Sequence, residues 1–176
     1  GRLTEISYPS GRSLSYTYDE AGRRESMTDQ DSNTLFYDYD DLGRLTQMRD
    51  DSGMVVDYGY DGAGNLTREE NANGTVTTYA YDDAGRLTEI ENQAADGTLN
   101  SRFAYSYNEA GLRTEVETGD GTWTYGYDAA GQLTSAEFAS TNPEIPDKSL
   151  TYEYDAAGNR VRMVEDGEVT NYTTND

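Results

Sequence analysis

The strongest constraint on the fold is a twelve-residue phrase that recurs along the chain. It reads YAYDDAGRLTEI at 79–90, YDYDDLGRLTQM at 37–48 and YGYDGAGNLTRE at 58–69, with looser copies starting at residues 16, 105, 125 and 152. Its glycine returns at intervals of 20 to 27 residues, most often 21, at Gly1, Gly22, Gly43, Gly64, Gly85, Gly111, Gly131 and Gly158. Such a period is typical of repeat folds, in which each unit stacks on the next.

Each unit contains a segment in which apolar and aromatic residues alternate with small or polar ones. Period two places alternate residues on the same face of a β-strand. One face carries an apolar residue and two tyrosines, and the other is small or polar, as at Thr17, Asp38 and Gly59. The tyrosine pairs are Tyr16/Tyr18, Tyr37/Tyr39, Tyr58/Tyr60, Tyr79/Tyr81, Tyr105/Tyr107, Tyr125/Tyr127 and Tyr152/Tyr154. The pattern predicts strands of a sheet with one aromatic face.

An aspartate, or in one repeat an asparagine, follows each tyrosine pair, three positions before the glycine. Aspartate at the first place and glycine at the fourth are typical of a type I turn whose glycine has a positive φ. The aspartate side chain can accept hydrogen bonds from nearby turn amides. The turn residues are Asp19, Asp40, Asp61, Asp82, Asp128 and Asp155, with Asn108 in the same place. Turn chemistry therefore explains this acidic column.

The strand after each turn is less regular. Leu87 and Ile90 are three residues apart, as are Leu45 and Met48. In a regular strand this spacing would place them on opposite faces, whereas a β-bulge would bring them to one face. The sequence leaves both alternatives open.

Together these patterns predict an all-β fold of stacked antiparallel hairpins, forming one curved or spiralling sheet of about 16 strands. We expect residues 1–176 to be a single segment of about eight hairpin units, truncated at both ends, because the chain begins within the phrase and its tail, NYTTND at 171–176, resembles the start of another. Two longer intervals predict insertion loops at 92–102 and 139–149.

Composition limits the classes of function. The net charge is −21, which disfavours binding to nucleic acid and to anionic lipid. The chain has no Cys and no His, so it lacks thiolate chemistry and the commonest general base and metal ligand. No apolar run is long enough to insert into a membrane. We expect no cofactor and no catalytic residue.

The recurring string YxYDxxGRLT resembles the YD repeat of the Rhs family, which includes Rhs polymorphic toxins, the B and C components of Tc toxins and the teneurin YD shell. The clearest matches run through Tyr37–Arg44, Tyr58–Gly64 and Tyr79–Thr88, with Arg44 and Arg86 after the glycine. Asn65, Leu112, Gln132 and Asn159 depart from that arginine. We expect the arginines Arg2, Arg23, Arg44 and Arg86 to pair with neighbouring aspartates or to stack on tyrosine.

The resemblance implies a segment of a β-shell with a structural, non-enzymatic role. Such a shell encloses a C-terminal toxin or effector domain, or scaffolds a large secreted or surface protein. Its implied partners are the remaining YD repeats of the parent chain and an enclosed toxin domain. The implied location is secreted, at the cell surface, or delivered by a bacterial secretion system.

Three other hypotheses stay open. Asp29, Asp31 and Asn33 have the spacing of half a calcium loop, although a solvated turn explains them equally simply. Phe103 and Trp123 stand among the tyrosines and could face a sugar or peptide ligand, as in an adhesin, or simply pack. Finally, the unpaired end strands could join copies into oligomers or fibres.

Overall fold

The computed structural model describes residues 1–173 and is all-β. Sixteen strands form one open antiparallel sheet in which the spatial order follows the sequence order. Within the described residues there is no helix that could span a membrane. The strands are β1 (Glu5–Ser7), β2 (Ser13–Tyr18), β3 (Arg24–Asp29), β4 (Thr34–Tyr39), β5 (Leu45–Asp50), β6 (Gly53–Tyr60), β7 (Leu66–Asn71), β8 (Val76–Tyr81), β9 (Leu87–Gln93), β10 (Leu99–Tyr107), β11 (Arg113–Thr118), β12 (Gly121–Tyr127), β13 (Leu133–Ser140), β14 (Lys148–Tyr154), β15 (Arg160–Glu165) and β16 (Glu168–Asn171). The predicted fold class is confirmed.

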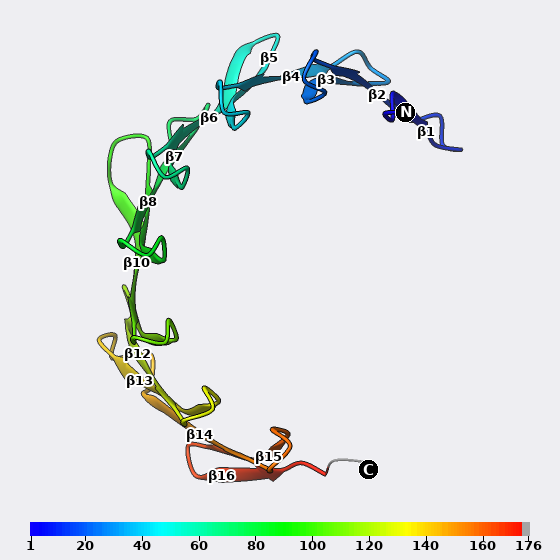
Figure 1. The fold of residues 1–176 in the computed structure, drawn as a ribbon. Coiled ribbons are helices and arrows are strands. Elements are labelled where there is room, and N and C mark those ends of the chain that lie inside the picture. The colour runs from blue at the N-terminus through cyan, green and yellow to red at the C-terminus, as the bar shows by residue number, and fades with distance from the viewer. Residues whose placement is uncertain (174–176) are drawn as a thin grey trace. The chain divides into compact units, whose positions relative to one another are not determined.

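The chain divides into two units, which are described separately below. Unit 1 contains Gly1–Tyr79 and Asn92–Leu99, and unit 2 contains Ala80–Glu91 and Asn100–Asp176. In each unit the hairpins follow one another directly, and in Figure 1 the turns that carry the Asp and Gly of the phrase project toward the same side of the strands.

The strand register confirms that the tyrosines of a pair share one face. Tyr16 lies opposite Met27, and Tyr37 lies opposite Met48, so methionine joins the tyrosines on what we call the tyrosine face. The other face, here called the polar face, carries pairs such as Thr17 with Ser26. Alternation along each strand produces this separation.

A recurring β-bulge settles the question of the strand after the turn. Tyr39 lies opposite Leu45 and Tyr37 opposite Met48, with the register shifting between Asp38 and Tyr39. The extra residue brings Leu45 and Met48 to the tyrosine face although they are three apart. The same shift occurs before Tyr18, Tyr60, Tyr107, Tyr127 and Tyr154.

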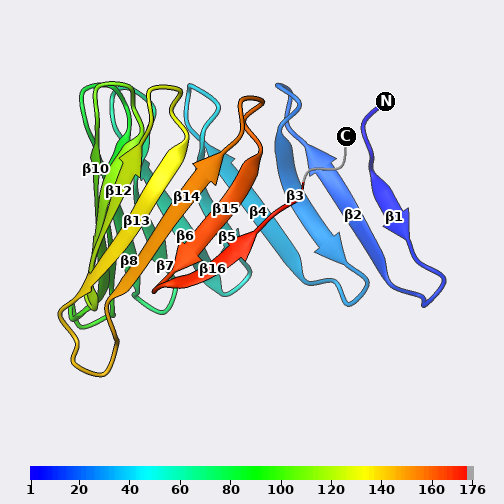
Figure 2. The ribbon, with the colours of Figure 1, turned by 90° about the horizontal axis from the view of Figure 1, so that it is seen from below.

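The predicted turn chemistry is present at the phrase, which we call the motif turn. In the turn 40–44, the Gly43 amide donates to the Asp40 carbonyl at 2.9 Å and the Asp40 amide donates to the Arg44 carbonyl at 3.0 Å. Gly43 has φ +79°, a conformation that disfavours side chains. This is a three-residue hairpin with a glycine bulge. The motif turns span 19–23, 40–44, 61–65, 82–86, 108–112, 128–132 and 155–159. Within unit 1, Figure 2 shows the turns that join β2 to β3 and β4 to β5 at the same end of their strands.

A single-layer sheet has little deep interior. The buried apolar side chains among the described residues are Val56, Val116, Ala136 and Phe138. Most other residues of the tyrosine face are only half-buried. Contacts along the sheet, rather than a thick core, must therefore hold neighbouring hairpins together.

The predicted insertion loops are too wide. Over 92–102, β9 continues to Gln93 and β10 begins at Leu99, so only a tight turn at 94–98 separates two lengthened strands. The second loop is shorter than 139–149, because β13 ends at Ser140 and β14 begins at Lys148. Figure 2 shows this loop projecting at the end of the strands opposite to the motif turns.

Candidate functional site

The distinctive chemistry of the chain lies where one hairpin meets the next, beside the motif turns. There the strand pairing between consecutive hairpins stops short. The pairing of β5 with β6 begins only at Gln47 and Asp57, so Leu45 and Tyr60 lie beyond it. We call such a place, between two successive motif turns, a seam.

In six of the phrases, the second tyrosine binds across the seam. The Tyr60 hydroxyl donates to the Leu45 carbonyl at 2.8 Å. This bond satisfies a backbone acceptor outside the paired stretch, and an unsatisfied buried carbonyl is unfavourable. The equivalent bonds join Tyr18 to Leu3, Tyr39 to Arg24, Tyr107 to Leu87, Tyr127 to Arg113 and Tyr154 to Leu133, at 2.6–2.9 Å.

The arginine after the motif glycine makes three contacts at the same seam. Arg44 Nε donates to the Asp40 carboxylate at 2.7 Å, and its guanidinium lies 4.6 Å from the centre of the Tyr60 ring. Its Nη1 donates to the Asp61 carbonyl, at 3.2 Å, in the next motif turn. Because it touches its own turn, the next tyrosine and the next turn, we call this arrangement an arginine clasp.

The clasp recurs in both units. In unit 1, Arg23 bonds to Asp19 and to the Asp40 carbonyl, and covers the Tyr39 ring. In unit 2, Arg86 bonds to Asp82 and to the Asn108 carbonyl, and covers Tyr107. Arg2 lies 5.5 Å from the Tyr18 ring. Arg23, Arg44 and Arg86 thus do both things that the sequence suggested. Each pairs with an aspartate and also stacks on a tyrosine ring.

Where arginine is absent, the contacts shrink. The side-chain amides of Asn65 and Asn159 donate to the aspartates of their own turns, Asp61 and Asp155, at 2.9 and 3.0 Å. Gln132 reaches the next motif turn through one bond of 3.3 Å, to the Gly158 carbonyl.

Five motif aspartates have a lowered pKa, namely Asp19, Asp40, Asp61, Asp82 and Asp155. Asp40 accepts a bond from the Arg44 amide, and this bond, with the Arg44 side chain, lowers the pKa of Asp40 against the opposing effect of partial burial. At Asp61 the Asn65 side-chain amide is the main cause of a lowered pKa. The carboxylates are thus part of the turn and are not poised to exchange protons near neutral pH.

A second set of arginines was missed at the sequence level. Arg24, Arg113 and Arg160 replace the usual leucine two places after the glycine. Their guanidinium groups lie 4.4–4.7 Å from the centres of the rings of Tyr16, Tyr105 and Tyr152, respectively. The signal that could have revealed them is that departure from leucine beside a tyrosine column.

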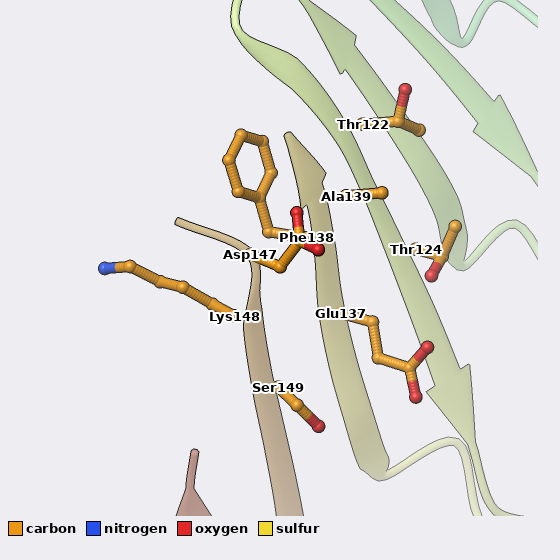
Figure 3. A pocket seen from close by; sticks show the side chains of 8 residues that line it. All are labelled: Thr122, Thr124, Glu137, Phe138, Ala139, Asp147, Lys148 and Ser149. Carbon is orange, nitrogen blue, oxygen red and sulfur yellow. The ribbon is translucent and has the colours of Figure 1, made fainter. Parts of the chain in front are cut away.

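The polar face carries shallow hollows. One, of about 340 Å³, is lined by Thr122, Thr124 and Glu137 among others. Figure 3 shows these side chains on one side of the strands, whereas Phe138 and Lys148 point away from them. The register agrees, since Phe138 lies opposite Lys148. The hollow is therefore shallow and open.

A second hollow, of about 430 Å³, surrounds an aromatic residue that breaks the repeat pattern. Phe36 stands on the polar face, where the other units have Ser, Asp, Thr or Ala before the first tyrosine. Arg49 covers its ring at 4.6 Å and bonds to Asp38 at 3.0 Å. This cluster gives the polar face of unit 1 a local apolar contact.

The calcium candidate is a hairpin turn. Asp29 Oδ1 accepts bonds from the Asp31 and Asn33 amides at 2.9 Å, and Oδ2 accepts from the Asn33 side chain at 2.8 Å. The Asp31 carboxylate accepts a bond from Gln30 at 2.7 Å. The backbone bonds match those of a motif turn, with Ser32 at φ +70° in place of glycine. Both Asp29 oxygens are thus engaged within the turn.

The two non-tyrosine aromatics have different surroundings. Trp123 stacks on Tyr125 with ring centres 6.2 Å apart and packs against Phe138 at 5.1 Å. Phe103 is half-buried on β10, two residues before Tyr105 on the same face. Trp123 therefore forms part of the packing of unit 2, together with the buried Phe138. Within residues 1–173, no three acidic side chains are arranged to hold a metal ion.

Comparison with protein families agrees with the motif. A model described as the RHS repeat matches residues 1–34, 39–74, 60–99 and 107–137, which together make up more than half of the chain. No curated protein gives a match.

Solved structures share the fold. The crystal structure of TcdB2-TccC3 superposes with a TM-score of 0.78 at 22% identity, over 91% of this chain and 10% of that one. The Tc holotoxin pore of Photorhabdus luminescens, with a mutated TccC3, gives 0.76 at 21% identity, over 90% and 9%. At these identities the likeness concerns the fold. The chain spans about a tenth of the length of these proteins.

Proposed function

Because the chain belongs to the RHS repeat family, as its matched repeats show, we propose that this structural segment forms part of the wall of a shell that encloses a toxin or effector polypeptide. The observation that carries the proposal is the repeated seam. Tyrosine, arginine and aspartate side chains of successive repeats join hairpin to hairpin in a sheet that has no thick core. Such a sheet extends by adding units, which suits a wall.

Further support comes from what the residues do chemically. The motif carboxylates are committed to turn amides and arginines, as the lowered pKa values of Asp40 and Asp82 indicate. A wall needs charged groups placed in this way, whereas acid–base catalysis needs groups with pKa values near the working pH. The wall's partners would be further YD repeats of the same chain and the enclosed polypeptide, in a protein that is secreted or delivered by a secretion system.

The proposal is tested by protease protection. The chain is expressed with the sequence that flanks it in its own gene, digested under native conditions, and mapped by mass spectrometry. We expect a flanking polypeptide that resists digestion inside the intact protein and is digested when expressed alone. Combining Tyr60→Phe with Arg44→Leu should weaken the wall and speed its digestion, whereas Tyr58→Phe with Arg12→Leu should not. Equal digestion inside and outside would contradict enclosure.

A further inference from the structure

One seam of unit 2 lacks the arginine clasp altogether. It lies between the motif turns 108–112 and 128–132, where Leu112 takes the arginine's place and Asn108 the aspartate's. The Asn108 side chain accepts a bond from the Leu112 amide at 2.9 Å, so the turn itself is intact. No hydrogen bond or ion pair of the described residues joins these two turns.

One tyrosine hydrogen bond and one apolar contact remain at this seam among the described residues. The Tyr127 hydroxyl still donates to the Arg113 carbonyl at 2.7 Å, but no guanidinium covers the Tyr127 ring in the described structure. A Leu112 methyl group lies 3.6 Å from where a Cβ of Gly131 would stand. The neighbouring seam retains Arg86, with its bond to Asp82, its stack on Tyr107 and its bond to the Asn108 carbonyl.

Below the same seam, away from the motif turns, the two strands are paired and partly buried. β11 pairs with β12 from Glu115–Thr124 to Thr118–Gly121, and Val116 is buried there. At the far end the loop after β13 folds back on the turn at 119–120, with the Thr141 amide donating to the Asp120 carbonyl at 2.8 Å. The weak seam is thus anchored at its opposite end.

We propose that the seam at Leu112 is a built-in opening point: the turns 108–112 and 128–132 separate in the native protein while β11 and β12 stay paired below. Local openings of this kind occur where few contacts hold a segment, without global unfolding. The inference does not depend on whether the sheet encloses anything. In a wall, this seam would yield before the neighbouring seam that keeps Arg86.

Hydrogen exchange on the 176-residue chain, resolved by mass spectrometry or NMR, tests the proposal. We expect the amides of 108–115 to exchange about five- to tenfold faster than those of 82–89, the fold-change that corresponds to losing one stacked, charge-assisted contact. The amides of 116–118 should stay protected in both cases.

Two reciprocal variants sharpen the test. Leu112→Arg should restore the clasp and slow exchange at 108–115 by a similar factor, and Arg86→Leu should speed exchange at 82–89. Leu99→Arg is the matched control, because it adds the same charge at an exposed site away from the motif turns. Equal exchange at the two seams in the unmodified chain, or slowing by Leu99→Arg as large as by Leu112→Arg, would overturn the proposal.

Discussion

The hydroxyl of Tyr60 donates a 2.8 Å hydrogen bond to the carbonyl of Leu45, on the neighbouring hairpin. This contact explains why the second aromatic of the phrase is tyrosine rather than phenylalanine. Beyond Gln47 and Asp57, β5 and β6 are no longer in paired register. The side chain takes over the role of the backbone at the point where the strands diverge, and Arg44 covers the same ring.

The arginine clasp should depend on the shape of the guanidinium. Arg44→Lys keeps the charge but loses the planar group that both stacks on Tyr60 and donates to Asp40 and Asp61. We expect a loss of about 1 kcal/mol in the free energy of unfolding, measured by urea denaturation. Arg12→Lys is the control, since within residues 1–173 the Arg12 side chain makes no hydrogen bond, ion pair or ring contact. Equal effects of the two variants would contradict the clasp.

Ser32 offers a site for stabilisation. It occupies the glycine position of a turn with φ +70°, where a side chain is strained by about 1 kcal/mol. Ser32→Gly should therefore raise the thermal midpoint of unfolding, with a gain below that figure because glycine loses more chain entropy on folding. The reciprocal change Gly43→Ser, at φ +79°, should lower it. A lower midpoint for Ser32→Gly would show that the turn is not strained.

Gly121 should be intolerant of any side chain. A Cβ there would collide with the Ala139 carbonyl and come within 2.8 Å of the Phe138 ring. Gly121→Ala should therefore destabilise unit 2 by about 1–3 kcal/mol. Gly119→Ala, two residues away, meets nothing within 4 Å and should be nearly neutral. Near-equal midpoints of chemical unfolding for the two variants would contradict the close packing at β12.

Acid should loosen the motif turns. Hydrogen bonds from Arg44, opposed by partial burial, lower the folded-state pKa of Asp40 below its ordinary 3.8, so the unfolded chain binds this proton more tightly. The resulting stability is present above about pH 4 and is lost as the pH falls through 3.8 toward the lowered folded value. Urea midpoints at high salt, which screens the general negative charge, should fall below pH 4.

The variant Asp40→Asn provides the control for that experiment. Asparagine can still accept the turn amide, as Asn108 does from the Leu112 amide. The variant should therefore fold, with a smaller loss of stability between pH 5 and pH 3 than the unmodified chain shows. An unchanged pH dependence would mean that Asp40 does not contribute to the acid response.

Much of the fold was predictable because the same strand and turn signals recur in every repeat. Alternation identified the strands and the tyrosine face, and Asp with Gly identified the turns. The bulge between Leu45 and Met48 could not be predicted, because a spacing of three residues fits either a bulge or two residues on opposite faces of the strand. The expected bounds of the loop at 92–102 were too wide. Several of its polar residues belong to two lengthened strands, which are joined by the turn at Gly97.

The seam itself was only partly predictable. The sequence suggested that arginine pairs with aspartate or stacks on tyrosine, and the structure has both. The partner of the tyrosine hydroxyl is a backbone carbonyl, which carries no signal in the sequence. The same applies to the Arg44 bond with the Asp61 carbonyl. A residue whose partner is a backbone atom of a neighbouring hairpin can be identified only from the structure, where the hairpins lie side by side.

Tyr60→Phe is the sharpest test of whether the phrase joins neighbouring hairpins. Tyr58→Phe is the matched control, because Tyr58 lies on the same strand and face but has no bond of this kind. We expect Tyr60→Phe to speed the hydrogen exchange of amides near Leu45 and Tyr60 about tenfold, because losing the hydroxyl bond removes about 1–2 kcal/mol of local stability. We expect little change in the exchange of these amides for Tyr58→Phe. Equal exchange rates in the two variants would show that the Tyr60 hydroxyl does not join the neighbouring hairpins.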